Sequence, residues 1–181
     1  MTPRIAARRI LGFETATPVL LQIAALAAAV GTIMSVLYAQ VDASSSQGPF
    51  AGLFASPIKF FVVQFLNTLV SAVLAYRVGK AFGGTGTMNG ALALLTGIAV
   101  VGTVLQLAQY VLLIVMPPLG FLLALFSLFW MFTALTSFIA ELHGFESRTK
   151  VLGGIILTVF GLAVLLLLLS MVLGITPLGP V

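Results

Sequence analysis

Five apolar stretches occupy most of this 181-residue chain, and each is long enough to cross a lipid bilayer. A helix needs roughly 20 mainly apolar residues to span the hydrocarbon core. Charged residues make up only 7% of the chain, whereas soluble domains carry about 25%. A water-soluble fold with so few charges would expose large apolar patches. The sequence therefore predicts an all-α integral membrane bundle of five transmembrane helices. The predicted spans cover about residues 18–41, 57–78, 89–116, 119–142 and 149–174 of a single domain, residues 1–181.

Prolines mark where several of these spans begin. Pro18 and Pro57 each suit the first position of a helix, where a missing N–H costs nothing. Pro117 and Pro118 separate the third span from the fourth, because proline cannot donate to the helix ladder and disfavours helix in the preceding residue. The connection between those two spans is therefore predicted to be very tight.

Positive charges are concentrated in the regions that five spans would place on one side of the membrane. Three lie before the first span, two between the second and third, and two between the fourth and fifth, so this side holds seven of the eight Lys and Arg. Because positive charge stays cytoplasmic, we expect the N-terminus inside, the C-terminus outside and these side chains at the lipid headgroups. They are Arg4, Arg8, Arg9, Arg77, Lys80, Arg148 and Lys150. Residues 3–13, PRIAARRILGF, are predicted to form a short amphipathic helix at the interface.

Polar side chains share faces on the predicted spans, with helical spacing. The candidate residues are Gln64, Asn67, Thr68 and Ser71 on the second span, Thr103, Gln106 and Gln109 on the third, and Thr136 and Ser137 on the fourth. Polar groups buried in lipid usually face other helices, so we expect these residues to hold a compact bundle together. The alternative is a polar pathway or a lipid-headgroup pocket. Proton and ion pathways usually contain an ionisable residue at mid-membrane, and the sequence places none there.

Residues 141–150, ELHGFESRTK, form the polar turn between the fourth and fifth spans. Gly144 fits a helix C-terminus, and Glu146 fits the start of the next helix, where the dipole favours a negative charge. Glu141 and His143 are not required to begin or end a helix. Glu141 is expected to pair with Arg77 or Lys80. One Glu and one His without a nucleophile are a weak catalytic signal. We therefore expect a solvated turn rather than an active site.

The sequence predicts no bound metal or cofactor. With no cysteines, thiol catalysis and Cys-ligated metals are excluded. Glu141, His143 and Glu146 lie within six residues of one another beside a glycine, which makes poor tetrahedral geometry. Residues 79–87, GKAFGGTGT, do not form a phosphate loop, because the lysine follows the first glycine and no strand precedes it. These glycines are expected to provide a flexible cytoplasmic turn.

Two short motifs carry a family resemblance. The first is Gly-Gly-x-Gly-Thr before the third span, and the second is a His-Gly-Phe-x-Ser turn before the fifth. Their residues are Gly83, Gly84, Gly86 and Thr87, then His143, Gly144, Phe145 and Ser147. With the five spans they resemble the Yip (Ypt-interacting protein) domain family, in its compact bacterial form, over about residues 3–175. The resemblance implies a five-span architecture and a tendency to act through partners. Eukaryotic relatives associate with prenylated Rab GTPases, aided by a long cytosolic N-terminal region; about seventeen residues precede the first span here, so a Rab role is not expected.

Three functions remain open on the sequence. The leading hypothesis is a non-enzymatic protein of the bacterial inner membrane that associates with another membrane protein or with itself, as a scaffold, accessory subunit or membrane organiser. Its expected partners include membrane lipids and exclude nucleic acid. The second hypothesis is a small transporter or lipid-handling protein, favoured by a cavity lined by Gln64, Asn67 and Gln106. The third is an intramembrane enzyme, favoured by a cleft that joins Glu141 and His143 to another polar group.

Overall fold

The computed structural model describes residues 3–41 and 56–172, and all the regular elements in these ranges are helices. They are α1 (Pro3–Gly12), α2 (Thr17–Val41), α4 (Pro57–Ala81), α5 (Met88–Val115), α6 (Pro117–His143) and α7 (Arg148–Val172). The all-α prediction is confirmed. Among them α2, α4, α5 and α6 are long and apolar enough to cross a membrane.

The fifth predicted span corresponds to α7. Within the described side chains its apolar part, Thr149–Gly161, is shorter than the four long helices. A fifth crossing therefore stays a prediction, as does the position of α1 at the membrane interface. Residues 173–174 of the predicted span lie outside the described residues.

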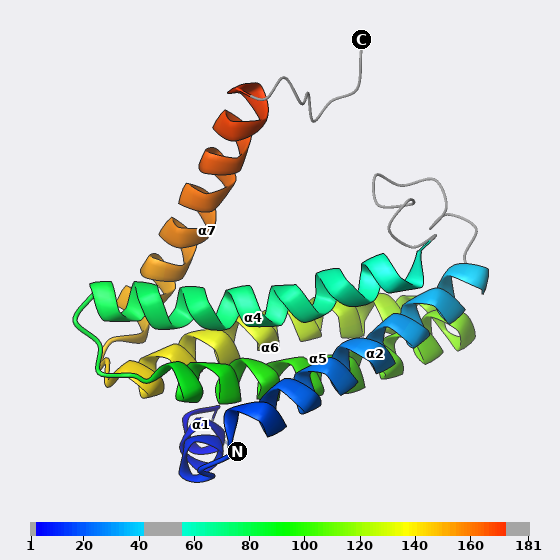
Figure 1. The fold of residues 1–181 in the computed structure, drawn as a ribbon. Coiled ribbons are helices and arrows are strands. Elements are labelled where there is room, and N and C mark those ends of the chain that lie inside the picture. The colour runs from blue at the N-terminus through cyan, green and yellow to red at the C-terminus, as the bar shows by residue number, and fades with distance from the viewer. Residues whose placement is uncertain (1–2, 42–55, 173–181) are drawn as a thin grey trace.

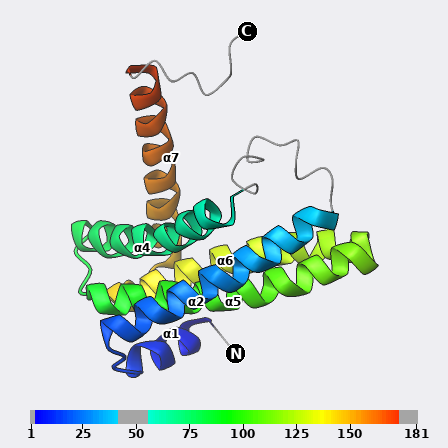
Figure 2. The ribbon, with the colours of Figure 1, turned by 45° about the vertical axis from the view of Figure 1, so that its right-hand side comes forward.

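The four long helices form a bundle around α5, which packs against α2, α4 and α6 (Figure 1). Helix α4 also packs on α2, whereas α4 and α6 meet mainly through α5. Helix α1 lies across the end of the bundle, against α6 and α5. Figures 1 and 2 both show α7 leaving that same end at a steep angle to the other helices. We call this end, which carries α1 and the turns 82–87 and 144–147, the basic end.

The turn between α5 and α6 is a single residue, Met116. Pro117 and Pro118 occupy the first positions of α6, where a missing N–H costs nothing. Just beyond them, a Cβ at Gly120 would lie 2.7 Å from the backbone N of Leu113. The tight hairpin between these two helices therefore depends on glycine at that position.

The buried apolar core contains residues from α1, α2, α4, α5 and α6. Small side chains such as Ala72, Ala75 and Ala91 let these helices approach closely, and Leu94 and Phe138 fill the space between them. Many large apolar side chains point outward instead, as expected for a protein whose solvent is lipid.

Candidate functional site

The imidazole of His143 is buried among three glycines at the basic end. Only 2% of the residue is exposed, so the expectation of a solvated side chain here is wrong. A Cβ at Gly79 or at Gly84 would overlap the ring, and one at Gly86 would crowd it. The glycine-rich turn that the sequence analysis treated as flexible therefore accommodates this one side chain. We call the arrangement of these three glycines around His143 the histidine socket.

Both ring nitrogens of His143 have hydrogen-bond partners. The backbone N–H of Gly86 donates to Nδ1 over 3.3 Å, so Nδ1 is an acceptor and carries no hydrogen. Nε2 therefore carries the hydrogen and donates it to the carbonyl oxygen of Ala75, 3.1 Å away. The carbonyl of His143 in turn accepts from the N–H of Thr85 at 3.3 Å. These bonds explain how an imidazole can be buried, because a buried polar group is costly only when it lacks partners.

The end of α6 is also held by α1. Nε of Arg8 donates to the carboxylate of Glu141, and Nη2 of Arg4 lies 3.3 Å from the carbonyl oxygens of both Phe145 and Glu146. From the sequence, Glu141 is expected to pair with Arg77 or Lys80. That expectation is wrong, because α1 folds back across the end of α6 and brings Arg8 to the carboxylate.

Of the seven cationic side chains expected at the headgroups, Arg4 and Arg8 thus bond to α6 and the turn after it. The side chains of four others are exposed at the basic end and keep that expected role as a prediction: Arg9, Arg77, Lys80 and Lys150. The side chain of Arg148 lies outside the described part of the structure.

A polar network joins α2 to α5 inside the bundle. Nε2 of Gln106 donates to Oγ of Ser35 at 2.8 Å and to the hydroxyl of Tyr110 at 2.9 Å. The Tyr110 ring stacks on that of Tyr38 with centroids 4.5 Å apart. One turn before Gln106 in α5, the hydroxyl of Thr103 lies 3.3 Å from the carbonyl oxygen of Ala27 in α2. Gln106 and Thr103 therefore contact another helix, as their positions on one face of the predicted span indicated.

The remaining candidate residues on α5 and α6 make no side-chain hydrogen bond to another helix in the described residues. Thr136 and Ser137 are buried, and Thr136 donates to Phe132 within α6 itself. Gln109 is half-buried and lies outside the network around Gln106. Asn89, which the sequence analysis did not single out, accepts from Thr17 and donates to the carbonyl of Thr15, tying the start of α2 to that of α5. A lone Asn at a helix start carries no sequence signal for this role.

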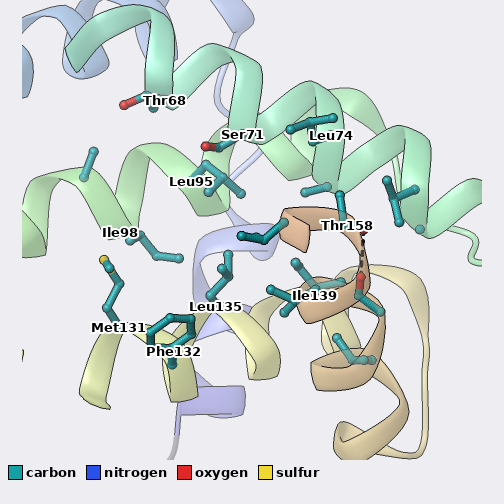
Figure 3. Close-up of a pocket in the computed structure, with 18 of the residues that line it drawn as sticks. Thr68, Ser71, Leu74, Leu95, Ile98, Met131, Phe132, Leu135, Ile139 and Thr158 are labelled. Carbon is teal, nitrogen blue, oxygen red and sulfur yellow. Dashed lines mark hydrogen bonds between the residues drawn. The ribbon is translucent and has the colours of Figure 1, made fainter. Parts of the chain in front are cut away.

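A cavity of about 1170 Å³ opens along the side of the bundle, between α4, α6 and the first turns of α7 (Figure 3). We call it the lateral groove. Its α6 wall is apolar, whereas its α4 wall carries the polar face predicted from the sequence. The residues that line the groove include Gln64, Asn67, Thr68 and Ser71 of α4, Gln106 of α5, Phe132 and Leu135 of α6, and Gly154 and Thr158 of α7.

Several polar side chains of the lateral groove have no partner within the described residues. Nε2 of Gln64 is buried without a hydrogen bond. Asn67 is exposed, Ser71 is half-buried, and neither side chain bonds to another group in the described ranges. In a bilayer such groups have no water to bond to, and each unsatisfied group costs several kcal/mol.

Comparison with known proteins identifies the family. A family model described as the Yip1 domain matches residues 1–170, which include α1, both motifs of the histidine socket and most of α7. No curated protein and no solved structure matches the chain. Among the described residues, no three His, Cys, Asp or Glu side chains come together as a metal site would require. On the match to its family model, which covers nearly the whole chain, this protein belongs to the Yip1 domain family.

Proposed function

We propose that this chain is a non-enzymatic membrane protein that acts by associating, within the plane of the membrane, with another transmembrane helix at the lateral groove. The observation that carries the proposal is the row of polar side chains on α4 that face the groove. Gln64, Asn67 and Ser71 recur at helical spacing on one face, and none has its hydrogen bonds satisfied within the described residues.

A helix suits this face better than lipid tails do. Interfaces between transmembrane helices are rich in small and hydroxyl or amide side chains, which allow close approach and hydrogen bonding across the contact. Acyl chains offer no acceptor or donor to Asn67 or Gln64. A helix can offer them polar side chains as hydrogen-bond partners and, where glycine lets the helices approach closely, backbone carbonyls. Each hydrogen bond gained in this way contributes roughly 0.6–2 kcal/mol.

The non-enzymatic part of the proposal rests on how Glu141 and His143 are used. Both nitrogens of His143 are occupied by backbone groups, and the carboxylate of Glu141 bonds to Arg8. A general base needs a free nitrogen or oxygen within reach of a substrate proton, and neither nitrogen of His143 is free. The roles of these two side chains in the described structure are to hold α4, α6 and α1 together.

The proposed location is the bacterial inner membrane, with the basic end in the cytoplasm. Support comes from the resemblance to compact bacterial members and from the concentration of exposed cations at that end, among them Arg9, Arg77, Lys80 and Lys150. Positive charge near helix ends is retained on the cytoplasmic side. The C-terminus would then lie in the periplasm if α7 crosses the membrane.

One observation favours a second function, lipid handling. The lateral groove is lined by Gln64, Asn67 and Gln106, the lining that the sequence analysis associated with a lipid-filled or wet cavity. A lipid with acyl chains along Phe132 and Leu135 would leave the α4 amides without partners unless its polar groups reached them. The two functions differ in what contacts α4, and this contact can be measured.

The test of the proposed function is to fill the groove. Ser71→Phe places an aromatic ring in the lateral groove, and Val70→Phe places the same ring on the neighbouring position, which is 51% exposed. Each variant is purified in mild detergent from native membranes, and the co-eluting proteins are identified. We expect Ser71→Phe to lose a protein that wild type and Val70→Phe retain. If all three preparations carry the same proteins, or none carries any, the groove is not an association site.

A further inference from the structure

Helix α7 is apolar in sequence, yet it projects away from the other long helices. Between Val151 and Val172 its sequence has only two polar residues, Thr158 and Ser170, so it has no polar face with which to lie in the interface. Yet it leaves the bundle at a steep angle to the four long helices in both views (Figures 1 and 2). If those four helices cross the bilayer, α7 can stay in hydrocarbon along its length only by turning toward them.

We infer that α7 is a movable fifth helix that seats in the lateral groove and leaves it to admit a partner helix. The inference rests on the proposed function and names the chain's own α7 as the competing occupant. The groove lies where α7 would arrive, because Gly154 and Thr158 in the first turns of α7 already line it. Only residues 144–147 connect α6 to α7, and Gly144 is in the left-handed conformation, with φ of 71°.

Setting the end of α4 level with the start of α7 gives a register for the seated state. Helix α4 runs toward the basic end and finishes at Ala81, whereas α7 begins there at Arg148 and runs away from it. Two antiparallel helices advance by the same 1.5 Å per residue. Ten residues back from Ala81 is Ser71, and ten residues on from Arg148 is Thr158. Both residues line the lateral groove, Ser71 from α4 and Thr158 from α7 (Figure 3), and the Thr158 hydroxyl donates to the carbonyl of Gly154 in its own helix.

The same register pairs small residues on either side of that contact. It places Gly154 beside Ala75 and Gly161 beside Thr68, so that positions i, i+4 and i+7 of α7 meet a face of α4 with the same spacing. Small residues on both helices permit a close approach of the two backbones. Of the unpaired α4 side chains, this register brings Ser71 beside the hydroxyl of Thr158.

The glycines of α7 have no packing role in the projecting position. A Cβ added at Gly154 or at Gly161 would meet nothing within 4 Å. By contrast, the glycines of the histidine socket and Gly120 are in tight contact with neighbouring groups. A helix interior normally disfavours glycine by roughly 0.5–1 kcal/mol relative to alanine. Glycines on the face that would meet α4 are explained if α7 spends part of its time seated there.

Disulfide trapping tests the seated state, and the chain has no native cysteine to interfere. The variant Ser71→Cys with Thr158→Cys is oxidised in native membranes and analysed for a bond within one chain. The matched control is Val70→Cys with Phe160→Cys, two exposed positions on the same helices. We expect an intramolecular disulfide in the first pair and none in the control. A covalent dimer from the first pair would show that a second copy fills the groove, and no bond at all would show that α7 does not seat; either overturns the inference.

A second variant tests the seated position without disturbing the rest of the fold. A Cβ at position 154 meets nothing within 4 Å in the projecting position, so the Gly154→Leu variant should still insert and fold. In the seated position the leucine would collide with Ala75. We expect Gly154→Leu to abolish the Ser71–Thr158 disulfide, and undiminished cross-linking in that variant would contradict the proposed register.

The locked form separates this inference from the proposed function. With the Ser71–Thr158 disulfide closed, the partner helix should be lost from the purified protein, and a reducing agent should restore it. A disulfide that forms while no partner is ever captured would leave α7 seating intact and refute the proposed function. If the double variant never forms the disulfide but still captures a partner, the proposed function stands and the seating of α7 is refuted.

Discussion

The backbone N–H of Gly86 donates a hydrogen bond to Nδ1 of His143, 3.3 Å away and 57 residues further along the chain. This bond joins the turn after α4 to the last residue of α6, and the Nε2–H bond to Ala75 adds α4 itself. The two motifs by which the chain resembles its family therefore form one unit in space. The glycines of the first motif make room for the histidine of the second.

Because the histidine socket is tightly packed, adding even a methyl group to one of its glycines should lower the stability of the protein. Gly79→Ala puts a methyl group where the His143 ring lies, so the ring or α4 must shift. Overpacking of this kind costs about 1–3 kcal/mol, which should lower the melting temperature in mild detergent. Gly102→Ala in α5 is the control, because a Cβ there meets nothing within 4 Å. Equal melting of the two variants would show that the socket does not constrain the fold.

Substitutions of His143 should show which of its two hydrogen bonds contributes more to stability. Asparagine can retain an acceptor near the position of Nδ1, and glutamine can retain a donor near that of Nε2. Loss of the acceptor leaves the Gly86 N–H buried without a partner, at about 1–3 kcal/mol, whereas the Ala75 carbonyl remains in the helix ladder of α4. We expect His143→Asn to melt above His143→Gln, with His143→Phe lowest. The reverse order of the first two would mean that the bond to Ala75 matters more.

The ion pair at the basic end should contribute little. The side chain of Arg8 is 71% exposed, and exposed pairs are worth at most about 1 kcal/mol. Glu141→Gln and Arg8→Gln should each lower the thermal stability slightly, and the double variant should lose no more than either single one. A double-mutant cycle at low and high salt checks this. A coupling that survives high salt would point to a pair shielded by lipid headgroups.

Prolines, glycines and apolar runs were enough to predict most helix ends. Helix α4 begins at Pro57, α6 begins at the Pro117-Pro118 pair, and α6 ends before Gly144, because each of these residues restricts the backbone locally. The steep departure of α7 could not be predicted in this way. It depends on how the turn 144–147 packs, and no local pattern encodes that.

The candidate site was predicted in part. The polar face of α4 could be recognised from its spacing, and it lines the lateral groove together with Gln106. The socket was missed because its members are far apart in sequence and glycines carry no side-chain signal. Arg8 was missed as the partner of Glu141 because it was expected to face the lipid headgroups, whereas α1 folds across the end of α6 and brings it to the carboxylate.

The orientation of the chain can be tested with reporter fusions. With the basic end inside, reporters inserted at Gly83 or Ser147 should score as cytoplasmic. A reporter after Val181 should score as periplasmic if α7 crosses the membrane. A cytoplasmic C-terminal reporter together with cytoplasmic internal ones would show that α7 does not cross, and four spans would then be the correct count.

The contact made by Asn67 in native membranes would show what occupies the lateral groove, because this side chain faces the groove without a partner among the described residues. A photo-crosslinking amino acid at position 67, with one at the exposed Val70 as the lipid-facing control, is activated in intact membranes and the adducts are identified by mass spectrometry. We expect peptide adducts at position 67, from a partner helix or from α7, and mainly acyl-chain adducts at position 70. Acyl-chain adducts in equal proportion at both positions would contradict it, since the groove would then be filled by lipid rather than by a helix.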